Sequence, residues 1–193
     1  MRKKLLIGAF VATGLVLTMG VTPAIADTTD STVSGGNLTT TTSGATLTGV
    51  TLDGKSTQTA TGNATSQWSV TDARGTGGAW TVSVTATVPT SAAGTVDSIA
   101  RTIAVSNLTV TPGTITAAAG ADPVGTTLTA PALAMSEASQ ALISSTGSNK
   151  GTYNVTPTFS LAIPANSYRS NWPGAVGTGT LNPYTSTLTY TIG

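Results

Sequence analysis

The chain of 193 residues contains neither cysteine nor histidine. Without cysteine it forms no disulfide bond and has no thiol nucleophile, and zinc sites built from cysteine and histidine are excluded. Without histidine it lacks the side chain that most often moves protons near neutral pH and that acts as the base of serine-type triads. Because the commonest catalytic groups are missing, we expect no enzymatic activity.

Charged side chains are also scarce, at 8% of the residues. Glu137 is the only glutamate, and Asp53, Asp72 and Asp122 stand alone in the sequence. A calcium loop presents several oxygen-bearing side chains at alternate positions, and a glycosidase needs two facing carboxylates. Neither pattern is visible along the chain, although folding could bring two carboxylates together. We therefore expect no cofactor and no bound metal ion.

Basic residues form a cluster only at the N-terminus, where Arg2, Lys3 and Lys4 precede the apolar run Leu5 to Met19. That run is short for a membrane span, and Ala24-Ile25-Ala26 matches the small-x-small pattern before a cleavage site. We predict that residues 1–26 are a secretory signal peptide and that the mature chain starts at Asp27. No hydrophobic tail and no Leu-Pro-x-Thr-Gly signal is visible at the other end, so any attachment to the cell would be non-covalent.

Residues 27–193 carry no basic patch. Nucleic acid is therefore an unlikely partner, and the scattered charges would not hold the chain on an anionic membrane after signal cleavage. The charged side chains of this region are five basic and seven acidic ones: Lys55, Arg74, Arg101, Lys150 and Arg169, and Asp27, Asp30, Asp53, Asp72, Asp97, Asp122 and Glu137.

Threonine is far more frequent than in ordinary proteins, and it alternates with apolar residues in short runs. Because threonine is β-branched and suits a pleated surface with one wet face, this pattern favours β-strands. We expect a flexible leader at residues 27–37, followed by one domain at residues 38–193. Strands are expected in its first half at residues 47–52, 58–61, 67–71 and 80–88.

The second half continues the pattern. Ile99, Arg101, Ile103 and Val105 share one face of a predicted strand, and the phase then slips, which indicates a bulge or tight turn near Asn107. Residues 135–144 have helical propensity and are expected to form one short helix or a loop. Residues 153–163 alternate as a strand, with Pro157 at an edge or bulge. A loop at 165–182 and a last strand at 184–192 follow.

These elements predict an all-β fold: a single antiparallel β-sandwich with at most one short helix outside the signal peptide. The strongest alternation lies in residues 80–88 and in the C-terminal residues 184–192. Both segments open on an aromatic residue, Trp80 and Tyr184. We expect the two distant segments to lie side by side as hydrogen-bonded strands, apolar on one face and covered by hydroxyl groups on the other.

The sequence Asp72-Ala73-Arg74-Gly75 is typical of a rigid turn in which the carboxylate caps backbone N–H groups and meets the guanidinium group. A ligand-binding loop is the alternative interpretation. Aromatic residues make up only 5% of the chain, and most lie on strand-like alternation, which favours core packing. Trp172 differs, because it follows Tyr168 and Arg169 in a loop. These three residues form a candidate glycan-binding site, unless Trp172 folds back over the core.

Two segments resemble the sequence marks of the WxL domain, a module of Gram-positive surface proteins. The first is Asp72-x-Arg74-Gly75 followed by Trp80-Thr81-Val82, where valine replaces the family's leucine. The second is the closing strand, with Tyr184, Leu188 and Tyr190, and the run from Leu161 to Asn166 resembles the segment that precedes it. The resemblance implies an extracellular protein bound non-covalently to the cell wall, through peptidoglycan or an associated glycan.

Two other functions stay open at this point. The chain could be a self-assembling subunit of a surface fibre or pilus, with itself or other surface proteins as partners, since low charge and a loose leader suit strand addition. The regular row Thr185, Thr187, Thr189 and Thr191 would also suit ice binding. Ordinary threonine on a wet sheet face explains that row equally well.

Overall fold

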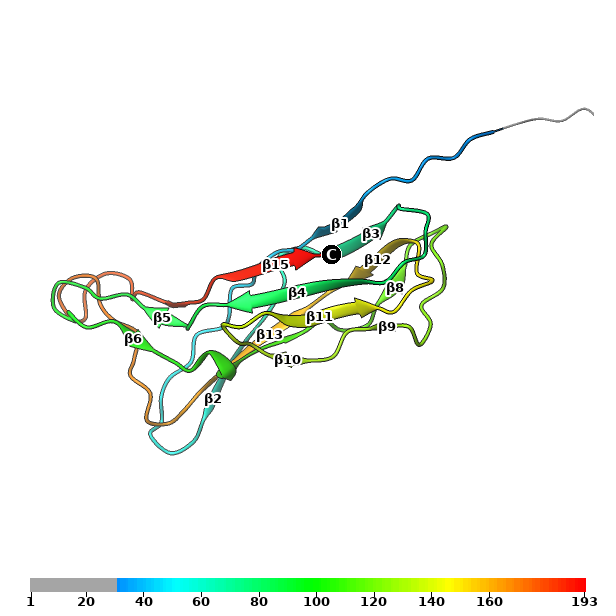
Figure 1. Ribbon diagram of the computed structural model, residues 1–193. Helices are drawn as coiled ribbons and strands as arrows, with labels where there is room; N and C mark the ends of the chain where they lie inside the picture. The colour runs from blue at the N-terminus through cyan, green and yellow to red at the C-terminus, as the bar shows by residue number, and fades with distance from the viewer. Residues whose placement is uncertain (1–30) are drawn as a thin grey trace, which may run out of the picture. The chain divides into compact units, whose positions relative to one another are not determined.

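The computed structural model describes residues 31–193, so the predicted signal peptide at 1–26 and the first part of the predicted leader lie outside the described residues. Ser34–Gly193 forms a compact unit that is all-β, with antiparallel sheets packed together as a single β-sandwich-like domain (Figure 1). The predicted fold class is confirmed. Among the described residues the only helical segment is the 3-10 turn η1, Val105–Asn107.

Within residues 31–193, fifteen strands make up four sheets. The first sheet has the order β1-β3-β12-β8, with β1 Leu38–Thr41, β3 Trp68–Asp72, β12 Gly151–Val155 and β8 Thr116–Ala117. The second has the order β10-β7-β13-β2, with β10 Leu133–Ala134, β7 Leu108–Thr111, β13 Thr158–Ile163 and β2 Gln58–Asn63.

The third sheet has the order β15-β4-β11-β9, with β15 Leu188–Ile192, β4 Trp80–Ala86, β11 Gln140–Ser145 and β9 Leu128–Thr129. The fourth has the order β14-β5-β6, with β14 Tyr184–Thr185, β5 Thr90–Ser91 and β6 Arg101–Thr102. In Figure 1 the third sheet lies in front of β3, β12 and β13.

The two distant segments pair as predicted. β15 runs antiparallel to β4, with Leu188 opposite Ala86 and Ile192 opposite Val82. The same ribbon continues into β14 and β5, where Tyr184 lies opposite Ser91. Alternate residues of β4 are buried, and the threonines of β15 are exposed while its apolar residues pack against the core. One face is therefore dry and the other carries hydroxyl groups.

The core lies between the sheets and is filled by the alternate apolar residues of their strands. Trp68 packs edge-to-face against Phe159 and Tyr190, with ring centroids 6.1 Å and 4.9 Å away. Such aromatic pairs add to the burial of apolar area, which is the main stabilising term. The fully buried large side chains include Trp68, Trp80, Tyr153, Met135 and Leu142.

The prediction of a strand at residues 47–52 is wrong. Residues 46–57 form no strand, although the Thr48 N–H donates to the Thr61 carbonyl at 2.8 Å and Ala45 forms an isolated bridge with Ala64. The segment precedes β2 in sequence and lies beside it, but the two do not form a continuous ladder of backbone hydrogen bonds. Its alternation of apolar and polar residues reflects one side facing the core, with Leu47, Val50 and Leu52 partly buried.

The helix allowed at residues 135–144 is also absent, since Gln140–Ser145 forms β11. A register shift between Ala141 and Ile143 places both Leu142 and Ile143 in the core. Because this bulge puts two consecutive apolar residues inside, the period of two that marks a strand is hidden in the sequence. Tertiary packing here overrides helical propensity.

Residues 153–163 form two strands of different sheets, β12 and β13, instead of one strand. The chain changes sheet at Pro157, which lacks the N–H that a continuing ladder would use. Its carbonyl accepts a hydrogen bond from the Ala64 N–H at 2.9 Å. The expectation of an edge or a bulge for Pro157 is therefore replaced by a break between two strands, β12 and β13.

Two further expectations concern residues 99–107 and the last strand. The predicted irregularity near Asn107 is the turn η1. Ile99 and Ile103 do not share a buried face, because Ile99 is 63% exposed and Ile103 only 4%. The C-terminal strand predicted at 184–192 is interrupted between β14 and β15, where the Ser186 hydroxyl donates to the Thr87 carbonyl.

Candidate functional site

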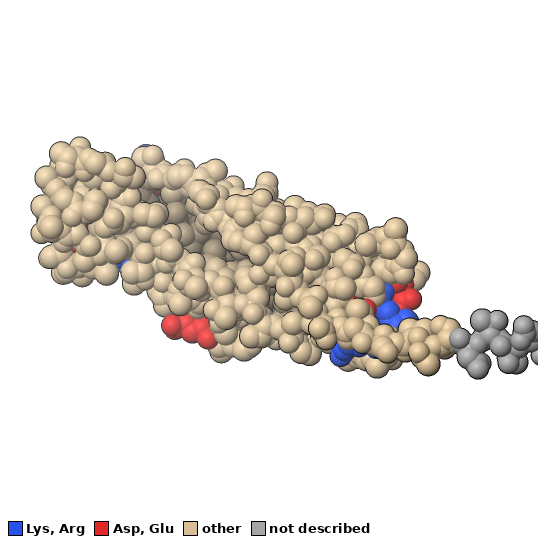
Figure 2. Space-filling model, turned by 90° about the horizontal axis from the view of Figure 1, so that it is seen from above, with Lys and Arg blue, Asp and Glu red and all other residues tan. Residues whose placement is uncertain are grey.

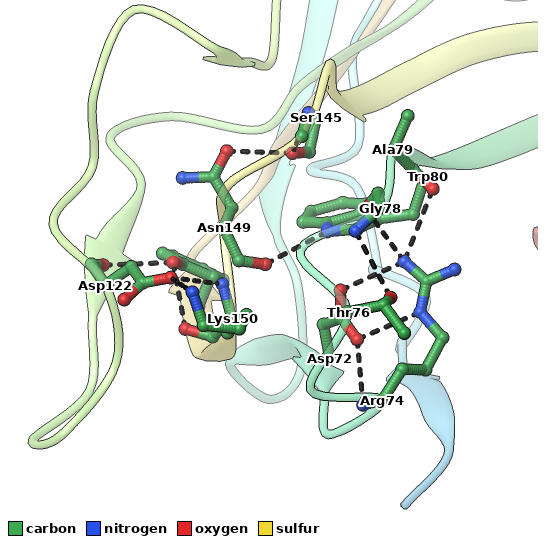
Figure 3. A network of polar contacts seen from close by, with 12 residues as sticks. Asp72, Arg74, Thr76, Gly78, Ala79, Trp80, Asp122, Ser145, Asn149 and Lys150 are labelled. Carbon is green, nitrogen blue, oxygen red and sulfur yellow. Dashed lines mark hydrogen bonds and ion pairs between the residues drawn. The ribbon is translucent and has the colours of Figure 1, made fainter. Parts of the chain in front are cut away.

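The Asp72–Arg74 turn closes one corner of the domain (Figure 3). Asp72 ends β3, and its side chain is fully buried. One carboxylate oxygen accepts from the backbone N–H and the Nε–H of Arg74, and the other accepts from Nη2, all at 3.0 Å. Arg74 also donates to the Gly78 carbonyl at 2.9 Å, so the guanidinium group ties the start of the loop to its end.

Electrostatics and backbone conformation both favour this turn. The hydrogen bonds and charge of the Arg74 side chain hold the pKa of Asp72 below its ordinary value, although burial opposes the shift. Gly75 has a φ of 72°, a left-handed conformation that glycine adopts without steric cost. All partners of this ion pair belong to the turn itself, so we interpret it as structural.

A second polar cluster lies beside the turn and was not found by sequence reasoning. Asn149 is 1% exposed, and its Oδ1 accepts from the hydroxyls of Thr127 and Ser145, each at 2.8 Å. Its carbonyl lies 3.5 Å from the indole nitrogen of Trp80 (Figure 3). The cluster satisfies polar groups within the fold, as buried polar groups require. An isolated asparagine in a turn-like sequence gives no signal of this role.

The remaining motif residues lie in or against the core. Trp80 and Val82 are 2% and 1% exposed on β4. Leu188, Tyr190 and Tyr184 are partly buried and pack against the same core. The motif residues are thus distributed over a paired ribbon and its closing turn. Their positions supply packing, and none of them groups with a nucleophile or a proton acceptor in a catalytic arrangement.

The candidate glycan-binding residues lie at the other end of that ribbon, in two loops that contact each other, residues 90–102 and 167–183; we call these the loop pair. Asp97 joins the loops. Its carboxylate accepts from both terminal nitrogens of Arg169, at 2.8 and 3.2 Å, and from the Trp172 backbone N–H at 2.9 Å. These bonds, led by the one from Arg169, hold the pKa of Asp97 below its ordinary value.

Asn171 fixes the loop pair from inside. It is 2% exposed, and its Nδ2 donates to the carbonyls of Ala92 and Ile99 at 3.1 and 2.8 Å. Its backbone N–H donates to the Ser91 hydroxyl at 2.8 Å. A Cβ atom at Gly94 would collide with the Trp172 carbonyl, so the two backbones approach closely there. The loop pair is therefore held by specific bonds across about 80 residues of sequence.

The three predicted glycan-binding residues all lie in the loop pair, but they differ in their exposure and in their contacts. Trp172 is partly buried, and Arg169 is exposed but already paired with Asp97. Tyr168 is 62% exposed. The Arg101 guanidinium carbon lies 3.9 Å from the centre of the Tyr168 ring, a cation–π contact that supports the ring from one side. The Tyr184 hydroxyl donates to the Tyr168 carbonyl at 2.8 Å and fixes its backbone.

Arg101 and Asp97 were not part of the sequence-based site. One signal could have found them: the second loop's single cation, Arg169, and the first loop's single acid, Asp97, are opposite charges in a chain with few charges. Only the fold shows that the two loops are neighbours. The resulting arrangement combines an exposed aromatic ring with guanidinium groups, which suits stacking and hydrogen bonding to a polar ring.

Among residues 31–193, no group of three or more metal-ligating side chains lies together, and no helix is long and apolar enough to cross a bilayer. Comparisons with protein-family models, curated proteins and solved structures found no match to this chain. The resemblance to WxL domains therefore stays a prediction, which is based on the segments around Trp80 and Tyr184.

Proposed function

We propose that this chain is an exported protein that attaches non-covalently to the bacterial cell wall, with peptidoglycan or an associated glycan as its ligand, and that it catalyses no reaction. The observation that carries the proposal is the exposed Tyr168 ring, which is supported by Arg101 on one side and held by a rigid loop pair. A predicted signal peptide and the absence of histidine and cysteine are consistent with this role.

The chemistry of Tyr168 suits a sugar. The apolar face of a sugar ring stacks on an aromatic ring, while its hydroxyl groups need donors and acceptors at the rim. Arg101 supplies N–H donors beside the ring, and the paired Arg169 and Asp97 add polar groups in the same loop pair. Since the loops are fixed by Asn171 before any ligand binds, little ordering would oppose binding.

Co-sedimentation with isolated Gram-positive cell walls tests the proposal. We expect protein comprising residues 27–193 to sediment with the walls, and Tyr168→Ala to weaken the apparent affinity about three- to tenfold, as the loss of one exposed aromatic contact predicts. Val176→Ala is the matched control, because Val176 is 54% exposed in the same loop. Recovery of the unaltered protein in the supernatant would contradict wall attachment. An equal loss for both variants would remove Tyr168 from the site.

The fibre-subunit alternative needs a donor strand. The predicted leader, residues 27–37, contains one large apolar side chain, Val33, which is 95% exposed. Donor strands bury several alternate apolar residues, so the leader is poorly suited to that role. Electron micrographs of the purified protein distinguish the two functions, because filaments would favour the subunit and dispersed particles the wall-binding protein.

A further inference from the structure

An apolar groove of about 850 Å³ lies between residues 42–52 and the C-terminal ribbon of β14 and β15. Its floor is the inner face of the second sheet, with Leu108, Phe159 and Leu161. Arg169, at the end nearest the loop pair, is the one charged residue that lines it. Figure 2 shows the molecule from above, and few charged side chains appear on that face. Tyr168 also lines this end, so the groove in the described part of the chain is apolar and extends to the proposed glycan-binding residues.

One wall of the groove is an unpaired strand edge. β15 is the last strand of its sheet, and only β4 pairs with it. Gly193 and Thr81 exchange two backbone hydrogen bonds, at 2.7 and 3.2 Å. In an antiparallel ladder such pairs alternate, so Thr189 and Thr191 also direct their N–H and C=O groups to β4. The backbone groups of Leu188, Tyr190 and Ile192 therefore point away from β4. Of these residues, Leu188 and Tyr190 line the groove, and β1 lies close to β15 outside it.

The opposite wall, residues 46–52, is extended but lies outside any strand. Thr48 bonds to Thr61 of β2, and no backbone bond is found for residues 49–52 within the described part of the chain. The wall is anchored by Ser43, whose carbonyl accepts from the Trp68 indole N–H at 3.0 Å. Two backbone edges with unused hydrogen-bonding groups thus flank an apolar floor. That combination fits an added β-strand with alternate apolar side chains.

The charge of the groove limits which kinds of segment can bind in it. Its lining is neutral except for Arg169 at the loop-pair end, which is paired with Asp97, and the Arg101 guanidinium group lies there against the ring of the lining residue Tyr168. This end has an excess of positive charge, so it complements an acidic residue. A strand added antiparallel to β15 would have its C-terminal end there, because β15 begins at that end with Leu188. The expected ligand is therefore an uncharged strand with alternating apolar residues and a carboxylate at its C-terminal end.

The described part of the chain does not supply such a segment. Its alternating apolar strands are already part of the sheets, as in β4, β12, β13 and β15. Most of the exposed large apolar side chains outside the sheets lie in the loop pair, and their spacing does not alternate, as with Val96 and Ile99 in one loop and Val176 and Leu181 in the other. We propose that the groove accepts an extended segment of another exported protein, which adds to the edge of β15 and buries alternate apolar residues between residues 42–52 and the C-terminal ribbon.

Binding of a synthetic peptide to the protein comprising residues 27–193 tests this proposal. The probe is acetyl-Thr-Val-Thr-Leu-Thr-Val-Thr-Glu-amide, and its binding is followed by the fluorescence of Trp68, whose ring contacts Tyr190 of the groove. We expect saturable binding. A peptide of the same composition with its three apolar residues consecutive should bind at least about tenfold more weakly, because only alternation directs all three side chains inward.

N-methylation tests strand addition itself. Residues directly opposite each other in an antiparallel pair have side chains on the same face, so the peptide's central leucine would exchange backbone bonds with Tyr190, which lines the groove. N-methylation of the central leucine should therefore weaken binding about tenfold more than N-methylation of a neighbouring threonine. Equal effects at the two positions, equal binding of the consecutive-apolar peptide, or no binding of the alternating peptide would overturn the proposal.

A groove variant completes the test. Leu181 lines the groove and is 39% exposed, so Leu181→Arg should fold normally and abolish peptide binding. Val124→Arg is the control, because Val124 is equally exposed, at 40%, and lies outside the groove. If the protein associates with itself without peptide, and Leu181→Arg abolishes that association, the occupant is a second copy and the assignment to another protein is overturned. Because Tyr168 also lines the groove, wall co-sedimentation and peptide binding are both measured for Leu181→Arg and for Tyr168→Ala, so that failure of one proposal is distinguished from failure of the other.

Discussion

At the scale of single residues, the few charged side chains form ion pairs mainly at the ends of loops. Asp72 with Arg74 closes the turn before β4, and Asp97 with Arg169 joins the loop pair. The first carboxylate is fully buried, whereas the Asp122–Lys150 pair is partly exposed on both sides. A buried carboxylate requires its partner, because an uncompensated charge is strongly disfavoured away from water.

We expect Arg74→Ala to reduce the free energy of unfolding near neutral pH, and to reduce it progressively less as the pH falls from about 6 to about 2. In the native protein the pKa of Asp72 is depressed, so the ion pair stabilises the fold above the ordinary pKa of 3.8, and this contribution is lost as the pH falls through the depressed value. Without Arg74, burial raises the pKa of Asp72, and the deficit is largest where the carboxylate is ionised.

Urea unfolding across this pH range measures the deficit. Lys150→Ala is the matched control, because it removes a cation 2.7 Å from Asp122 in a partly exposed pair. Such pairs contribute little, so its effect should be small at every pH. A deficit for Arg74→Ala that does not vary with pH would show that the guanidinium group acts through packing alone.

At the scale of elements, the structure shows how local irregularities change the meaning of a sequence pattern. Pro157 divides one alternating run between two sheets, and the bulge after Ala141 hides a strand in a run with helical propensity. Residues 46–52 alternate like a strand yet pair only through Thr48. In residues 46–52 and 153–163 the hydrophobic period correctly predicted the core-facing side chains, but pairing depends on what lies beside the segment. In β11 the bulge hid the period itself.

The unpaired edge of β15 gives a prediction at this scale. Amide hydrogen exchange in the peptide-free protein should alternate along β15, slow at Thr189 and Thr191 and faster at Leu188 and Tyr190, because only the first two amides point to β4. NMR-detected exchange at residue resolution measures this. Uniform protection along β15 would show that a further strand covers the edge, and would contradict an open groove in the isolated protein.

At the scale of the whole molecule, the fold is held by contacts between distant segments. The Thr187 N–H donates to the Thr87 hydroxyl across 100 residues of sequence, and the pairs of β4 with β15 have similar separations. The third sheet cannot form until the C-terminal strand β15 is available. The chain must first close a long loop, at a cost in entropy, before the contacts between β4 and β15 can stabilise the sheet.

A chain that ends at Pro183 should therefore fail to fold cooperatively. It lacks β14 and β15, and with them the partly buried Leu188, Tyr190 and Ile192 that pack against the core. Circular dichroism and limited proteolysis report the loss. The control is a chain that begins at Ser34, where the compact unit starts, and it should keep the fold. Cooperative unfolding of the C-terminally shortened chain would contradict a structural role for the last ribbon.

The sequence by itself determined the fold class, the apolar faces of β3, β4 and β13, and the pairing of two distant ribbons, because alternation of threonine with apolar residues fixes which side of a strand is dry. It also indicated the Asp72–Arg74 turn, whose partners are two residues apart. Only the tertiary structure decided that Asp97 and Arg101 join Tyr168, that Asn149 fills a buried polar cluster, and that β15 borders a groove. Those features depend on which segments become neighbours across the sheets, and no local pattern of residues encodes that choice.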